Sequence, residues 1–329
     1  MHRKSFFQMT IFIVSLFGIA GFGLTGAQAA APVQVKTQAP GFYRMMLGDF
    51  EVTALSDGSV PREVDKLMSK PEEVLRVLAR DHESLPLQLS INGFLINTGN
   101  RLILVDTGTG KRADSPTSGR LLANLRAAGY RPEQVDAILL THMHGDHNGG
   151  LSVNGKRVFP NAVVYVNKRE LDYWFNPAGK QFSAKMRKKI SKLEHERMDP
   201  YIKAGKLRTF QGAVRLFPGI STVPAYGHTP GHTAYMVESQ GNKLLLWGDI
   251  IHCAEVQFAD PSVTISYDSD PAMAEKTRLK ILAEAASQGF LVGAAHISFP
   301  GIGHVRADAS GYSWIPVPYN SAPGDPPRP

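Results

Sequence analysis

The sequence predicts a layered α/β fold, in which strands and helices alternate around a common core. Short runs rich in branched apolar residues recur along the chain, and several are followed by segments with helical spacing that end at glycines. The chain has 329 residues, of which 43% are hydrophobic and 20% are charged. This composition is typical of a folded protein with a large core, and it excludes disorder and a multi-span membrane protein.

The predicted strands are short apolar runs bounded by turn residues. They are residues 50–55, 87–97, 101–105, 137–140, 163–166, 233–237, 243–247 and 290–295. Residues 118–128 are predicted to form a helix, because leucines recur with helical spacing and Gly129 follows them. A second helix is predicted from Pro271 to Gln288, because Asp270 can cap its first turn and Gly289 can end it.

Residues 182–193 have the pattern of an inserted amphipathic helix. Phe182, Met186, Ile190 and Leu193 follow helical spacing, and lysines and an arginine lie between them. One interpretation is a helix with a solvated basic face. The other is a lid over a pocket, in which Phe182 and Met186 would face a substrate.

The two ends of the chain have distinctive compositions. Arg3 and Lys4 precede an apolar run at 11–24 and an Ala-x-Ala site at 27–29, which together predict a secretory signal peptide over residues 1–29. We therefore expect a periplasmic or secreted protein without stable membrane association; a membrane anchor would need a longer apolar run. The proline-rich segment 316–329 is expected to be an extended tail, which leaves residues 30–315 as the folded domain.

Charge and cysteine content limit the partners and the metal ligands. The net charge of +7 is small and dispersed, so together with export it predicts no nucleic-acid partner. Cys253 is the single cysteine, which excludes an internal disulfide and a multi-cysteine metal site. Any metal must therefore be held by histidine, aspartate or glutamate side chains.

The segment Thr-His-Met-His-Gly-Asp-His-Asn-Gly-Gly at 141–150 places four ligand-type side chains within six residues, directly after an apolar strand. On such a loop, His142 and His144 can face one metal while Asp146 and His147 face a second. Imidazole and carboxylate ligands suit zinc first, with manganese, iron or cobalt as alternatives. A polar surface loop is an improbable interpretation of this density of ligands.

Three further ligand-type residues stand beside later predicted strands: His228 in Gly-His-Thr-Pro-Gly-His, Asp249 after Gly248, and His296. Ligand sites in α/β folds gather at strand ends, so these residues can converge on the first cluster. The sequence thus predicts two divalent ions. His142, His144 and His228 would bind one ion, Asp146, His147 and His296 would bind the other, and Asp249 would bridge them.

The order H-x-H-x-D-H, G-H-T-P-G-H, G-D and a late histidine resembles the metallo-β-lactamase superfamily, and Leu-Val-Asp-Thr-Gly at 104–108 resembles its early strand-end motif. The resemblance covers essentially the whole chain after residue 29. It implies a four-layer αβ/βα sandwich with a dinuclear metal site at one edge. We expect Asp106 and His232 to orient ligands through hydrogen bonds.

Longer stretches are similar to the methyl parathion hydrolases and their lactonase relatives. These stretches are GFYRMMLGDFEVTALSDG, AAGYRPEQVDAILLTHMHGDHNGGL, GHTPGHTAYMVESQGNKLLLWGD and SFPGIGHVRA. The similarity implies an exported dinuclear-metal hydrolase that is often a homodimer. Two positions depart from the pattern: Gly145 replaces a more usual proline or alanine, and His252 replaces the leucine of methyl parathion hydrolases, which would make the pocket less apolar.

Two divalent ions that share a water lower its pKa from about 16 to about 7, so the predicted reaction is attack by a metal-bound hydroxide, with Asp146 or Asp249 moving a proton. We expect a lactonase or aryl esterase acting on dihydrocoumarin-like or acyl-homoserine lactones, with promiscuous organophosphate hydrolysis. The alternatives are an efficient organophosphate triesterase and a non-catalytic periplasmic metal-binding protein. A β-lactamase and a nuclease fit the sequence less well.

The walls of the substrate pocket are predicted from the aromatic and other large side chains near the ligand motifs. Aromatic side chains suit a flat aromatic or alkyl substrate, although the same residues could simply pack in the core. The candidate pocket residues are Phe94, Trp174, Phe182, Met186 and His252.

Overall fold

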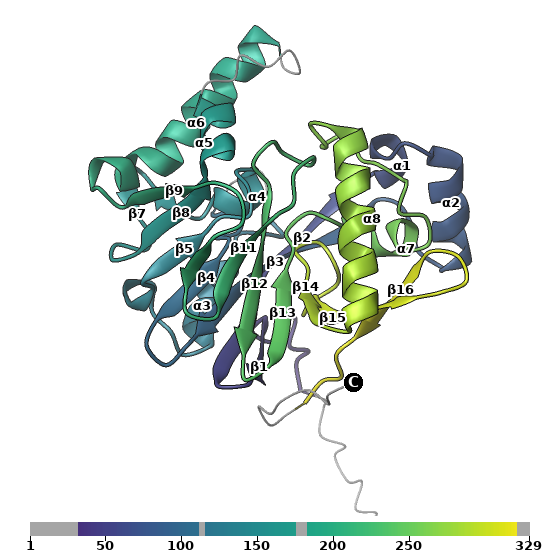
Figure 1. Cartoon of the computed structure of the whole chain (residues 1–329), viewed down its shortest axis with the longest axis horizontal. Coiled ribbons are helices and arrows are strands. Elements are labelled where there is room, and N and C mark those ends of the chain that lie inside the picture. Colours follow the sequence, from purple (N-terminus) through teal and green to yellow (C-terminus); the bar gives the residue numbers. More distant parts are fainter. Residues whose placement is uncertain (1–31, 112–115, 176–182, 321–329) are drawn as a thin grey trace, which may run out of the picture. The chain divides into compact units, whose positions relative to one another are not determined.

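The computed structural model describes residues 32–111, 116–175 and 183–320 (Figure 1). Residues 32–38 form no helix or strand, and the folded unit begins at Ala39. The predicted signal peptide lies outside the described residues, so export stays a prediction, as does the homodimer. Within the described ranges, no helix combines the length and the apolar character that crossing a membrane would require.

Two seven-stranded sheets form the centre of the fold. The first contains, in spatial order, β1 (Phe42–Leu47), β2 (Phe50–Arg62), β3 (Leu87–Asn97), β4 (Leu102–Val105), β5 (Ala137–Leu139), β8 (Val163–Asn167) and β9 (Leu207–Phe210). The second contains β10 (Arg215–Phe217), β11 (Ile220–Pro224), β12 (Thr233–Ser239), β13 (Asn242–Leu246), β14 (Leu291–Gly293), β15 (Ile302–Ala307) and β16 (Tyr312–Pro316). A small hairpin pairs β6 (Ser152–Val153) with β7 (Lys156–Arg157).

Helices cover the outer faces of both sheets (Figure 1). They are α1 (Val64–Leu67), α2 (Pro71–Arg80), α3 (Leu121–Ala127), the 3₁₀ turn η1 (Pro132–Gln134), α4 (Gly145–Asn148), α5 (Lys168–Phe175), α6 (Ala184–Lys203), α7 (Ala254–Gln257) and α8 (Pro271–Gln288). Buried side chains of α3, α5 and α6 pack on the first sheet, and those of α8 pack on the second. A further core lies between the sheets, so the predicted four-layer sandwich is confirmed.

Parallel pairing fixes where the strand ends meet. In the first sheet β4 pairs in parallel with β5, and β5 with β8; in the second, β13 pairs in parallel with β14. Parallel strands end at the same edge of a sheet, so the residues that follow β4, β5, β13 and β14 gather at one edge. These residues carry the ligand motifs of the sequence.

Several predicted elements are confirmed, and others differ at their ends. The strand at 87–97 and the helix at 271–288 have the predicted bounds, and Asp270 accepts a hydrogen bond from the Met273 amide as an N-cap. The first predicted strand continues to Arg62, through a register shift between Ser56 and Gly58. The proline-rich tail begins inside β16, and the Val317 amide still bonds to the Ile302 carbonyl, so residues just past the predicted boundary are docked.

Candidate metal centre

The predicted ligands converge at the edge where the parallel strands end. Thr141 and His142 follow β5, and the short helix α4 carries the next part of the motif. Asp249 and His296 follow β13 and β14 in the second sheet, while His228 lies on the loop before β12. Ligand-type atoms fall into groups within 4.8 Å of one another, namely His142, His144, His228 and Asp249 in one group, and Asp146, His147 and His296 in another. The structure therefore brings all seven predicted ligands together.

The first group directs three imidazole nitrogens at one point. The Nδ1 of His144 lies 3.0 Å from the Nε2 of His142 and 3.0 Å from the Nε2 of His228. Oδ2 of Asp249 completes the group, 3.5 Å from His142 and 3.2 Å from His228. Lone pairs that face one another in this way fit a divalent cation better than a hydrogen-bond network, because each hydrogen bond needs one protonated nitrogen.

The second group shares Asp249 with the first. Oδ1 of Asp249 lies 3.1 Å from Nε2 of His147, and its Oδ2 lies 3.2 Å from Nε2 of His296. Asp146 faces the same two imidazoles at 3.9 and 3.6 Å. Nε2 of His147 and Oδ1 of Asp249 are buried without a hydrogen bond, which a shared cation would satisfy. The donor set therefore fits two metal ions bridged by Asp249.

Hydrogen bonds on the outer side of three of the rings fix which nitrogen faces inward. Nδ1 of His147 contacts Oδ2 of Asp106 at 2.8 Å, and Nδ1 of His228 contacts Oδ1 of Asp268 at 2.9 Å. Nδ1 of His296 donates to the Ser90 carbonyl at 2.8 Å. An outer proton on Nδ1 leaves the inner Nε2 lone pair free for a metal, and the carboxylates also increase ring basicity.

The electrostatics of the cluster favour a bound cation. Burial and neighbouring imidazoles lower the pKa of His142 well below its usual value and that of His144 to about 3, so both rings are neutral. Burial raises the pKa of Asp249, but four surrounding histidines lower it by more. The net pKa lies well below its usual value, and the carboxylate stays ionised. Burial also lowers the pKa of His228, whereas Asp249 and Asp268 raise it to about 9. In the metal-free site the ionised carboxylates thus hold a proton on His228, and divalent cations bound there would take the place of such protons.

Glu170 of α5 connects the two ligand loops, and no sequence pattern pointed to it. Its Oε1 accepts hydrogen bonds from the Met143 amide at 2.9 Å and from Nε1 of Trp174 at 2.5 Å, while Oε2 accepts from the Gly231 amide at 3.0 Å. The side chain is fully buried, which raises the pKa of its carboxyl group. Glu170 therefore fixes the loop of His142 relative to the loop of His228.

His232 supports the bridging residue. Its Nδ1 donates to the Ala225 carbonyl at 2.9 Å, and its Nε2 accepts a hydrogen bond from the Asp249 amide at 3.2 Å. A Cβ added at Gly248 would lie 2.5 Å from this Nε2, so only glycine allows the close approach. His232 thus holds Asp249 directly, in addition to its expected place beside the His228 loop.

Helix α6 contacts the metal loop through the buried Glu194 and the partly buried Arg197. Glu194 accepts hydrogen bonds from Asn148 of α4 and from Arg197. Nη2 of Arg197 would lie 3.0 Å from a Cβ added at Gly145. The unusual glycine at position 145 therefore makes room for the guanidinium group of Arg197.

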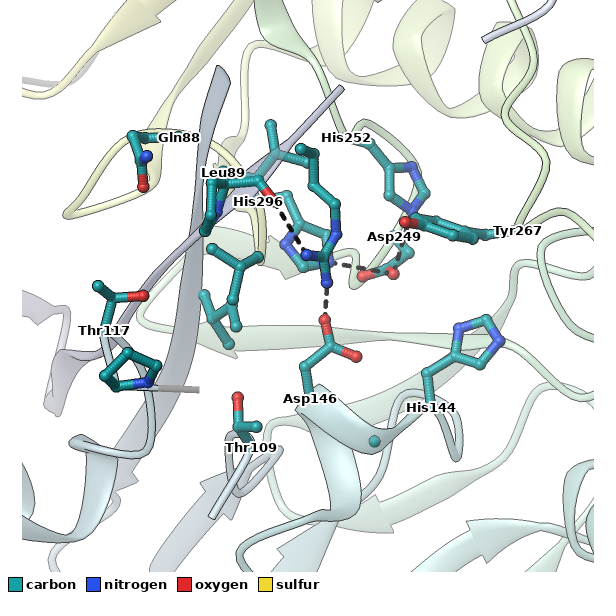
Figure 2. A pocket seen from close by; sticks show the side chains of 16 residues that line it. Gln88, Leu89, Thr109, Thr117, His144, Asp146, Asp249, His252, Tyr267 and His296 are labelled. Carbon is teal, nitrogen blue, oxygen red and sulfur yellow. Dashed lines mark hydrogen bonds and ion pairs between the residues drawn. The ribbon is translucent and has the colours of Figure 1, made fainter. Parts of the chain in front are cut away.

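An open cavity of about 650 Å³ lies over the cluster (Figure 2). Its floor includes His144, Asp146, Asp249, His252 and His296. Apolar residues of β2 and β3 form one wall, and polar residues complete the rim; the remaining lining residues are Val60, Pro61, Arg62, Gln88, Leu89, Ile91, Thr109, Pro116, Thr117, Gly145 and Tyr267. The volume suits a small organic molecule.

Among the predicted pocket residues that the structure describes, His252 alone lines this cavity. Its Nε2 lies 3.2 Å from Oδ2 of Asp249, and its ring stacks on that of His296 with centroids 5.2 Å apart. Sequence reasoning missed Arg62, Gln88 and Tyr267, which come from segments without a ligand motif.

The other predicted pocket positions need correction. Phe94 is buried in the core between the sheets, because along β3 it shares the inward face with Ile96. Trp174 is also buried in the core, where its ring forms a T-shaped contact with His144 at a centroid distance of 5.3 Å. Met186 is 46% exposed near the start of α6 and does not line the cavity, so the lid interpretation fails for it. Phe182 lies outside the described residues.

Comparisons with known proteins agree with this architecture. The family model described as "Metallo-beta-lactamase superfamily" matches residues 87–296. A solved structure titled "hydrolase AbOPH in beta lactamase superfamily" is 35% identical, covers 87% of this chain and 100% of its own, and superposes with a TM-score of 0.80.

Two lactonases are also similar to the chain. The structure of AidC, a dizinc quorum-quenching lactonase solved with its product N-hexanoyl-L-homoserine, is 29% identical, covers 85% of this chain and 99% of its own, and has a TM-score of 0.78. An N-acyl homoserine lactonase of Bacillus cereus is 25% identical over 212 residues, which are 59% of this chain and 76% of that protein. With the ligand cluster and the four-layer fold in place, these matches establish that the chain belongs to the metallo-β-lactamase superfamily and is a metal-dependent hydrolase.

Proposed function

We propose that this protein opens lactones by hydrolysis at a site that holds two zinc ions. One observation carries the proposal: both oxygens of Asp249 face different imidazole groups, on the floor of a cavity large enough for a small organic substrate. The similar proteins AidC and the Bacillus cereus enzyme are named lactonases, which supports a lactone as the substrate. We include aryl esters such as dihydrocoumarin in the same class, because their scissile bond is chemically equivalent.

Asp249 and Asp146 have different roles in the proposed reaction. Two divalent ions in such a site supply a water of lowered pKa and polarise the substrate carbonyl. Asp249 has both oxygens committed to imidazole groups, whereas the Asp146 side chain is 29% exposed and lines the cavity. We therefore assign proton transfer to the carboxylate of Asp146, which would take a proton from the attacking water and pass it to the leaving alkoxide.

The wall of the cavity determines which substrates can enter. Val60, Leu89 and Ile91 offer an apolar surface for the organic part of a lactone. His252 makes the floor polar beside Asp249. A polar floor favours a flat lactone ring with its two oxygens over a bulky phosphotriester, so we propose that organophosphate hydrolysis is a minor activity.

A zinc titration tests the proposal. The chelator-treated protein is mixed with zinc in steps, and hydrolysis of N-hexanoyl homoserine lactone is followed at each step. We expect activity to rise until two zinc ions per chain are bound. Asp249→Ala should bind less zinc and lose most activity, while Asp172→Ala, at an exposed carboxylate of α5, serves as the control. An active Asp249→Ala protein with two bound zinc ions would overturn the assignment of Asp249.

A further inference from the structure

Arg62 carries a positive charge into the cavity, at the side formed by β2 and β3. It stands two residues after Val60, so both side chains point to the same face of β2. In the register of the sheet, Pro61 lies opposite Gln88 and Arg62 lies opposite Leu87. Figure 2 shows Gln88 and Leu89 across the cavity from His252 and Tyr267.

The charge of Arg62 has no carboxylate partner in the described part of the chain. Its guanidinium group donates one hydrogen bond, to the Pro61 carbonyl at 3.0 Å, although such a group has five N–H donors. The acidic side chains among the residues that line the cavity are Asp146 and Asp249, and both face the histidine cluster. Arg62 is half-buried as a whole residue, but the hydrogen bond from its guanidinium group to Pro61 is exposed, so the group is accessible from the open cavity.

Three other enclosed arginines in the described residues lie within 4.0 Å of a carboxylate, whereas Arg157 instead lies over the Tyr201 ring, 5.9 Å from its centroid. Arg44 lies 3.2 Å from Glu51, and Arg197 binds Glu194. Arg278 is buried but donates to three backbone carbonyls and lies 3.7 Å from Asp268. Arg62 differs from these residues because it faces a cavity that a substrate can enter.

The strand register separates the backbone of Arg62 from the metal side of β3. The Ser90 carbonyl accepts a hydrogen bond from His296, which marks the metal side of β3. Arg62 lies opposite Leu87, three residues farther along, which corresponds to about 10 Å of strand. The side chains of Val60 and Leu89 lie along this distance and line the cavity. Val60 and Leu89 therefore offer an apolar surface to the part of a substrate that lies between a group bound to Arg62 and the scissile bond.

We propose that Arg62 binds a carboxylate carried by the substrate, so that the enzyme selects lactones whose acyl chain ends in an acidic group. This inference rests on the proposed lactonase function and names its substrate class. A guanidinium group binds a carboxylate through two parallel hydrogen bonds, which a methyl group cannot make. The apolar wall would contact the methylene spacer, and the lactone ring would lie over the histidine cluster.

A matched pair of substrates tests the proposal. N-hexanoyl and N-adipoyl homoserine lactone have acyl chains of equal length, which end in a methyl group and a carboxylate respectively. We expect wild-type kcat/KM to favour the adipoyl substrate by about 10-fold or more, mainly through KM. Arg62→Leu should remove this preference, and Arg62→Lys should keep part of it, because an ammonium group retains the charge but not the paired donors.

Controls separate Arg62 from general charge effects. Arg126→Leu removes the same charge from the exposed end of α3 and should keep the wild-type preference. Raising the salt concentration should reduce the preference in the wild type. Equal substrate ratios in the wild type and in a folded Arg62→Leu protein would overturn the role of Arg62.

The two proposals can fail separately. Turnover of the hexanoyl lactone by the wild type tests the lactonase function without involving the carboxylate. If neither lactone is hydrolysed, the lactonase function fails, and Arg62 is then judged by calorimetry with N-adipoyl- and N-hexanoyl-homoserine, the ring-opened compounds. Tighter binding of the adipoyl compound that is lost in Arg62→Leu would support carboxylate recognition, whereas equal affinities would overturn it.

Discussion

At the scale of single residues, the metal centre depends on side chains that are not themselves metal ligands but hydrogen-bond to the ligands. Asp268 accepts the outer proton of His228 and also lies beside the buried guanidinium group of Arg278. Asp106 does the same for His147 and in addition accepts hydrogen bonds from the amide and hydroxyl groups of Thr141. These contacts fix the orientation of the imidazole rings before any ion binds. The ligand side chains are therefore already ordered in the folded protein, and ion binding does not have to order them.

Replacing Asp268 with asparagine tests this role. Asparagine keeps the shape but removes the negative charge that supports the outer proton of His228. We expect zinc affinity or activity to fall by about 10- to 100-fold. Zinc content after dialysis and kcat/KM on a lactone measure the effect, with Asp172→Asn as an exposed control. Unchanged zinc affinity would show that Asp268 has no orienting function.

The ligands and the residues that orient them differ in how well the sequence predicts them. The seven ligands lie in short motifs after strands, and the spacing within these motifs identifies them as candidate metal ligands. Glu170 and Asp268 reach the site from distant segments, and their importance comes from contacts with backbone amides and an imidazole that no local pattern records. Arg62 is a similar case, because only the pairing of β2 with β3 brings it to the cavity.

At the scale of elements, α6 holds the metal loop in place through contacts of its second half. Its first turns do not form a wall of the pocket. Its second half packs Met198 and Tyr201 against the first sheet, and Glu194 reaches Asn148 of α4. The helical period at 182–193 predicted the first part of this helix but not its continuation to Lys203, and it could not show which face is buried. The alternation of β3 caused the error at Phe94 for the same reason, because either face of a strand can be the core face until its neighbours are known.

The buried carboxyl group of Glu194 should make stability depend on pH. Burial and the charge of Glu170 raise its pKa, Arg197 and Asn148 lower it, and the net value is about 7, compared with about 4.3 in an unfolded chain. Between these values only the unfolded chain ionises, so the free energy of unfolding falls as pH rises from about 4.5 to 7.

Glu194→Gln lacks this titration. The free energy of unfolding of Glu194→Gln minus that of the wild type should therefore increase by on the order of 2–4 kcal/mol as pH rises from 4.5 to 8. Urea unfolding of both proteins at several pH values measures the difference. Glu196→Gln, at an exposed position of the same helix, should show no such trend. A constant difference between Glu194→Gln and the wild type would contradict the assigned pKa.

At the scale of the whole molecule, the metal centre joins the two sheets. His142 and His147 follow strands of the first sheet, whereas Asp249 and His296 follow strands of the second. Bound ions would therefore tie the two halves of the sandwich together at one edge. The layered α/β class could be predicted from the alternation of elements, but the division into two sheets came from the family resemblance, because long-range pairing leaves little trace in the local pattern.

Removal of the metals should consequently destabilise the whole fold. Ions that bind only the folded state add stability by mass action, about 2.7 kcal/mol when free zinc is 100 times its dissociation constant. Chelation should lower the thermal midpoint and abolish lactone hydrolysis, and added zinc should restore both. A zinc-free protein with an unchanged midpoint would contradict a structural role for the site.

The most direct test of the central claim compares two substrates on the zinc-loaded protein. We would measure kcat/KM for dihydrocoumarin and for methyl paraoxon side by side, with a chelated sample as control. The account predicts a strong preference for the lactone, and loss of activity on both substrates when zinc is removed. A preference for the phosphotriester, or lactone hydrolysis that persists without metal, would contradict it.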